Sequence, residues 1–144
     1  MSNKLGRTAA ICGIGATEFS KDSGRSEMKL AVDAVSAAID DAGLTPSDVD
    51  GMVTYSTDNN PDVEIARNVG IGGLRHFSRV HYGGGAACGT IALATMAVAT
   101  GAADVVVCYR AFNERSGRRF GAGVQDLPNA ATAERAQFSY TSSQ

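Results

Sequence analysis

Residues 83–109 read GGGAACGTIALATMAVATGAADVVVCY, and this stretch decides the fold. Three glycines precede a run of small and apolar residues that Gly101 ends, which predicts a helix over residues 86–99. An apolar run over residues 104–109 then predicts a buried strand. Because the helix is apolar on nearly all sides, we expect it to be buried throughout, covered on both sides by another layer or another subunit.

The residues before this stretch continue the alternation of strand and helix. The clearest pattern is an apolar stripe that recurs every three or four residues and predicts a helix over 26–42, with Ser26 as N-cap and Gly43 just past the end. The other predicted elements are strands over 8–14, 51–55 and 74–82 and a short helix over 62–69. Helices long enough for crossovers between strands indicate an α/β fold with at least partly parallel pairing.

The composition is that of an ordinary globular domain. The chain has 144 residues, of which 44% are hydrophobic and 19% charged, enough to bury a core. Thirteen basic against fifteen acidic residues give a formal net charge of −2, so we expect no nucleic-acid partner. No run of about eighteen apolar residues predicts a membrane span, and the N-terminus lacks the pattern of a secretory signal.

The cysteines and histidines exclude a metal cluster by their spacing. Cys12, Cys88 and Cys108 are odd in number, lie far apart and form no CxxC pair, which predicts reduced thiols and a cytoplasmic location. His76 and His81 are too few and too isolated to hold a metal. We therefore expect no metal, and read both histidines as hydrogen-bonded strand residues, with a polar role beside a pocket as the alternative for His81.

Several stretches resemble the thiolase superfamily. Residues 38–51, AIDDAGLTPSDVDG, look like its first helix, turn and strand, and residues 83–107 resemble its nucleophile-bearing turn, central helix and following strand. Three shorter stretches resemble the lipid-transfer-protein group of that superfamily, which includes aldolases of bacterial sterol side-chain breakdown: residues 15–21 (GATEFSK), 83–88 (GGGAAC) and 110–117 (RAFNERSG). The resemblance implies a thiolase-like fold with a mixed sheet and a buried helix.

The resemblance also sets the expected domain organisation. Thiolase-like folds contain two similar βαβαβ halves, and residues 1–125 correspond to the N-terminal half-domain. Residues 126–144 then begin a loop that the sequence leaves incomplete, as in a truncated piece of a longer protein. We expect such a piece to be inactive alone, with the catalytic base in the second half of the fold.

One position departs from the thiolase pattern. Aligning residues 89–93 (GTIAL) with the thiolase sequence Gly-Ser-Thr-Ala-Leu places Ala86 where thiolases carry their nucleophilic cysteine. Cys88 lies two residues later, about 200° around the helix, so it points elsewhere. Since a methyl group cannot attack a thioester, covalent acyl transfer through this position is not available.

What remains is a pocket for an acyl-CoA, lined by Gly84, Gly85, Ala86 and Cys88. The glycines allow close approach of a ligand, and the N–H groups at the helix start could polarise a thioester carbonyl and stabilise an enolate. Retro-aldol cleavage of a β-hydroxyacyl-CoA needs this electron sink and a base, but no nucleophile. Coenzyme A would be part of the substrate, with no covalently bound cofactor. The alternative for the glycine run is a turn without a ligand.

The sequence analysis leaves three functions open. The first is a thiolase-like aldolase that cleaves a β-hydroxyacyl-CoA, with a sterol side chain as substrate. The second is a non-catalytic subunit that binds acyl-CoA or lipid or scaffolds a partner, and the third is a thiolase with Cys88 as nucleophile. The relatives imply a homodimer and a small OB-fold partner of the DUF35 type.

A cluster of basic residues follows the last predicted strand: Arg110, Arg115, Arg118 and Arg119. These arginines could bind the phosphates of coenzyme A or the acidic surface of a partner protein. The alternative is that they belong to an ordinary solvated loop.

Overall fold

A computed structural model describes residues 6–55, 58, 60–81 and 85–113. Its centre is a three-stranded sheet in the order β2-β1-β3, made of β1 (Gly51–Tyr55), β2 (His76–Val80) and β3 (Val106–Cys108). Gly51 lies opposite His76 on one side and Val106 on the other. Both described pairings are parallel, so the mixed pairing implied by the resemblance is not seen among these residues.

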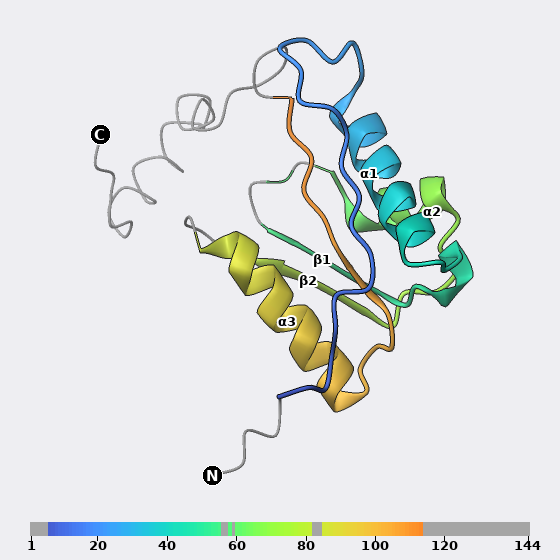
Figure 1. Ribbon diagram of the computed structural model, residues 1–144, viewed down its shortest axis with the longest axis vertical. Coiled ribbons are helices and arrows are strands. Elements are labelled where there is room, and N and C mark those ends of the chain that lie inside the picture. The colour runs from blue at the N-terminus through green and yellow to red at the C-terminus, as the bar shows by residue number, and fades with distance from the viewer. Residues whose placement is uncertain (1–5, 56–57, 59, 82–84, 114–144) are drawn as a thin grey trace, which may run out of the picture.

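The helices lie on both faces of this sheet (Figure 1). Helix α3 (Ala86–Thr100) covers one face, and α1 (Glu27–Asp41) and α2 (Asp62–Val69) lie on the other. The α/β class and the parallel pairing expected from the sequence are confirmed. The predicted strands over 74–82 and 104–109 are shorter in the structure: β2 pairs with the whole of β1, and β3 pairs only with Gly51–Val53.

Helix α1 begins and ends where local signals place its ends. The Ser26 Oγ accepts the backbone N–H of Lys29 at 3.2 Å and so caps the helix. Gly43 has φ of +67°, a left-handed conformation that a residue with a side chain adopts only with strain. A short 3-10 turn, η1 (Pro46–Asp48), then leads into β1.

The main core lies between the sheet and the α1–α2 layer. Its fully buried side chains include Val35 of α1, Met52 of β1 and Ile65 of α2. Burial of this apolar surface, about 25 cal/mol per Å², is the main force that holds the helices on the sheet.

The predicted strand over residues 8–14 is wrong. Residues 9–20 form no strand, although Figure 1 shows them running alongside the segment that leads through β3. Ile11 and Ile14 are 71% and 75% exposed, so the predicted burial is also absent. The segment is instead anchored to α1, where the Ile14 N–H donates to the Asp41 carboxylate at 2.9 Å. No described strand pairs with it, and apolar composition alone does not supply the missing backbone partners.

The expected burial of α3 on all sides is not seen among the described residues. Its inner side, with Ala86, Thr90 and Ala97, is buried against the sheet. Ile91 and Met96, on other sides of the helix, are 42% and 48% exposed. The reason is that the described part of the chain supplies only one layer against this helix.

Candidate functional site

The start of α3 lies at the carboxyl-terminal edge of the sheet. The chain leaves β2 at Val80 and enters α3 at Ala86, six residues later, so the helix runs back antiparallel to the strands. The other end is fixed at the opposite edge, where the Arg75 guanidinium, just before β2, donates to the Gly101 carbonyl at 3.0 Å. In open α/β sheets, ligands bind outside the carboxyl ends of the strands. The predicted pocket residues therefore lie at the edge where such folds place their sites.

The structure separates the predicted residues at the helix start. Gly85 precedes the helix, and a Cβ added to it would meet no atom within 4 Å, so the space beside it is open. Ala86 is 3% exposed, whereas Cys88 is exposed. This difference follows from the rotation of about 200° between the two positions. Gly84 lies outside the described residues.

The first turns of α3 sit closely against β2 and β3. A Cβ on Gly89 would lie 3.0 Å from the Val80 side chain. Glycine therefore lets α3 approach β2 this closely, and a larger residue would require the Val80 side chain to shift. On the other side, the Cys108 thiol lies 3.6 Å from the Thr90 carbonyl oxygen. Burial raises the pKa of the Cys108 thiol, which keeps it protonated and unreactive.

Arg110 extends from the chain just after β3 and stacks on two aromatic rings. Its guanidinium carbon lies 5.3 Å from the centre of the Tyr55 ring and 4.5 Å from that of Phe112. Such contacts hold a cation over the face of a ring. Of the four arginines in the predicted basic cluster, only Arg110 falls within the described residues.

A buried polar clamp fixes the backbone on both sides of Arg110. The Asp58 carboxylate, on a residue only 2% exposed, accepts the Ala111 N–H at 2.7 Å, the Asn60 N–H at 2.8 Å and the Asn60 side-chain amide at 2.9 Å. The Thr54 hydroxyl donates to the Tyr109 carbonyl at 2.9 Å. These bonds fix the carbonyl before Arg110 and the N–H after it.

Tyr109 completes this clamp. Its hydroxyl donates to the Asn60 carbonyl at 2.9 Å. Burial, together with the negative charges of Asp58 and Asp62, raises the pKa of Tyr109 well above its usual value, so the phenol stays protonated. The sequence analysis treated residues 58–61 as a polar turn and missed the clamp. The available signal was an aspartate two residues before an asparagine, a pairing that favours local side-chain bonds to the backbone.

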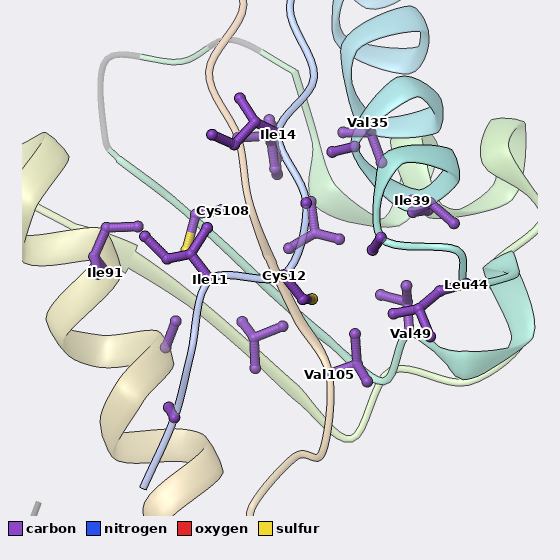
Figure 2. A pocket seen from close by; sticks show the side chains of 18 of the residues that line it. Ile11, Cys12, Ile14, Val35, Ile39, Leu44, Val49, Ile91, Val105 and Cys108 are labelled. Carbon is purple, nitrogen blue, oxygen red and sulfur yellow. The ribbon is translucent and has the colours of Figure 1, made fainter. Parts of the chain in front are cut away.

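An apolar cavity of the described residues does not coincide with the predicted pocket. It has a volume of about 730 Å³ and lies between the N-terminal segment, α1, α3 and β3. Figure 2 shows apolar side chains from all four around it, among them Ile11, Val35, Ile91 and Cys108. A second cavity, of about 470 Å³, lies beside residues 15–20 and 110–113. Neither Ala86 nor Cys88 lines either cavity.

Two further expectations concern metals and membranes. Among the described residues, no group of three or more His, Cys, Asp or Glu side chains is placed to hold a metal ion. In the same part of the chain, no helix is long and apolar enough to cross a membrane.

The two histidines differ in burial. His81 is exposed, and the buried Nε2 of His76 makes no hydrogen bond with the described residues, so the predicted bonding of His76 is missing at this atom.

Comparisons with known proteins find relatives that are aldolases. No protein-family model matches the sequence. The chain is 70% identical over 115 residues to a steroid side-chain-cleaving aldolase of Thermomonospora curvata, a match over 80% of the chain and 29% of the relative. It is 64% identical over 117 residues to a 17-hydroxy-3-oxo-4-pregnene-20-carboxyl-CoA lyase of Mycobacterium tuberculosis. This match covers 81% of the chain and 30% of the relative. The chain thus spans less than a third of the length of these curated relatives.

Two solved structures share the fold. An Ltp2–ChsH2(DUF35) aldolase matches 89% of this chain and 32% of its own with a TM-score of 0.76 and 62% identity. The priming β-ketosynthase of the R1128 polyketide pathway matches 67% of this chain and 32% of its own, with a TM-score of 0.51 and 20% identity. The ketosynthase shows the fold alone.

Proposed function

We propose that the protein containing this chain is a thiolase-like aldolase, a lyase that cleaves a β-hydroxyacyl-CoA in steroid side-chain degradation, and its similarity to such enzymes supports this. The observation that carries the proposal is the buried methyl of Ala86 at the start of α3. A site that keeps the thiolase-like helix start but has no nucleophile there suits chemistry without an enzyme-bound acyl group.

The reaction is a retro-aldol cleavage. A base removes the proton of the β-hydroxyl group, the carbon–carbon bond breaks, and a ketone leaves. The bonding electrons pass to the acyl-CoA as an enolate, which a proton then converts to the shorter acyl-CoA. The backbone N–H groups at the start of α3 favour negative charge on the thioester oxygen. Coenzyme A is part of the substrate in this proposal, and none of the described residues is assigned as the base.

The assembly is part of the same proposal. The aldolase of known structure is described as an Ltp2–ChsH2(DUF35) aldolase, which supports a DUF35 partner protein. We place the complex in the cytoplasm as a homodimer of the thiolase-like chain. We propose that this chain alone is inactive, because none of its described residues is assigned as the base.

The test uses a full-length protein that contains this chain, together with its DUF35 partner. Incubation with a steroid β-hydroxyacyl-CoA should release a ketone and a shorter acyl-CoA, measured by liquid chromatography and mass spectrometry. The matched control is the same thioester without the β-hydroxyl group, which should stay intact. Tight binding without cleavage of any such substrate would refute the lyase and select a non-catalytic acyl-CoA-binding subunit.

A further inference from the structure

Arg110 emerges on the same face of the sheet as α3. Alternate residues along this segment face the α1–α2 core: Val105, Val107, Tyr109 and Ala111. Cys108 faces the other way, with its thiol near the Thr90 carbonyl of α3. The Tyr109 N–H still bonds to the Val53 carbonyl at 3.1 Å, so the alternation continues past β3. Arg110 therefore extends on the α3 side.

Tyr55 supports this placement from the neighbouring strand. Met52 of β1 lies in the α1–α2 core, so the alternation of β1 places Tyr55 on the opposite face, with α3. The stacking of Arg110 over the Tyr55 ring then brings the guanidinium toward the end of β1, the central strand.

Arg110 is also level with the first residue of α3. From Thr90 back to Ala86 the helix advances about 6 Å toward the carboxyl-terminal edge of the sheet. From Cys108 to Arg110 the extended chain advances about 6.6 Å in the same direction. Because Cys108 and Thr90 are in contact, the two advances bring Arg110 to the height of Ala86.

The arginine is held in a form suited to an oxyanion. The buried clamp of Thr54 and Asp58 fixes its backbone, and the rings of Tyr55 and Phe112 hold its side chain. Stacking engages the faces of a guanidinium, whereas its five N–H donors point outward in the plane of the group.

We propose that Arg110 is a catalytic residue that stabilises the enolate oxygen formed on the thioester of the substrate. The inference rests on the proposed retro-aldol function and adds a side-chain cation to the backbone N–H groups of α3. When the carbon–carbon bond breaks, its electron pair moves onto the thioester carbonyl, and the charge of Arg110 lowers the energy of the resulting oxyanion. The same enolate forms when a base removes a proton from the α-carbon of the shorter acyl-CoA.

The test follows this second route to the enolate. The full-length protein with its DUF35 partner is incubated in D₂O with the shorter acyl-CoA and no ketone, and deuterium entering the α-carbon is measured by mass spectrometry. Arg110→Gln should slow exchange by about 100-fold, and Arg110→Lys should recover part of it. Affinity for the acyl-CoA should change by less than about 3-fold in both variants, because the charge acts mainly on the enolate.

Arg67→Gln is the matched control, since it removes the same charge from α2 on the opposite face and should leave exchange unchanged. The wild-type protein could exchange the α-proton of the acyl-CoA without cleaving the β-hydroxyacyl-CoA. If Arg110→Gln then loses this exchange, the lyase is refuted and the role of Arg110 is kept. Equal exchange in wild type and Arg110→Gln, including none in either, overturns the role of Arg110 whatever happens to cleavage. If weaker binding of the acyl-CoA explains all of the slower exchange in Arg110→Gln, the proposed role of Arg110 is overturned as well.

Discussion

The carboxylate of Asp58 accepts the backbone N–H of Ala111 at 2.7 Å, which ties the loop after β1 to the segment after β3 across 53 residues of sequence. The same carboxylate accepts two bonds from Asn60, so three donors depend on one buried group. The two strand ends beside the start of α3 are therefore held as one unit.

Replacing Asp58 by alanine should lower the free energy of unfolding by about 3 kcal/mol, because buried donors lose their acceptor. Urea unfolding of the full-length protein at pH 7 measures this change. Asp22→Ala is the control, since that exposed carboxylate accepts the Gly24 N–H at 3.1 Å, and its loss should cost less than about 1 kcal/mol. Equal losses in the two variants would mean that the clamp does not stabilise the fold.

Gly15→Ala should destabilise the fold by about 3 kcal/mol or more, since an added Cβ would lie 2.0 Å from the Ala34 carbonyl oxygen in α1. Gly72→Ala provides the comparison, because a Cβ there meets nothing within 4 Å. Its unfolding free energy should stay within about 1 kcal/mol of wild type. The thermal midpoints of both variants measure the difference, and a stable Gly15→Ala protein would show that residues 9–20 do not pack on α1 as described.

The pH dependence of stability should carry a contribution from Asp50. Burial alone would raise the pKa of this carboxyl, but the N–H groups of Val105 and Asp104 and the charge of Arg75 outweigh it and lower the pKa. A carboxyl with a depressed pKa in the folded state stabilises the fold above its unfolded pKa, about 3.9, and loses that contribution as pH falls through the folded value. Wild type should therefore be more stable than Asp50→Asn at pH 6.

This advantage should shrink as the pH falls below the unfolded pKa and through the lower folded pKa, because Asp50 then becomes protonated. Urea midpoints of both proteins at successively lower pH measure it, and the other carboxyl groups cancel in the difference. An advantage that does not shrink as the pH falls would contradict the assignment.

Cys88→Ala should leave kcat for cleavage within about 3-fold of wild type, because the thiol lies far around the helix from Ala86 and takes no part in bond breaking. Steady-state kinetics on the full-length complex and mass spectrometry of the trapped enzyme check this. Loss of activity in Cys88→Ala, together with an acyl group on that thiol in wild type, would instead identify a thiolase.

Sequence reasoning succeeded where the signals are local. Ser26 and Gly43 mark the ends of α1 because capping depends on residues within one turn of the helix end. It failed at residues 8–14, since strand formation depends on a partner strand that the apolar pattern does not reveal.

The candidate site divides in the same way. The place of Ala86 at a helix start followed from glycine spacing and an apolar run, and the structure confirms that position. The contacts of Arg110 and Asp58 join residues more than fifty positions apart and could not be predicted from either neighbourhood. Only the sheet register brings them together.

Within the described residues β3 pairs with β1 alone, so its outer backbone groups have no strand beside them. A row of unpaired strand amides is a template on which a strand of another chain can assemble, so any change that uncovers this edge should favour aggregation.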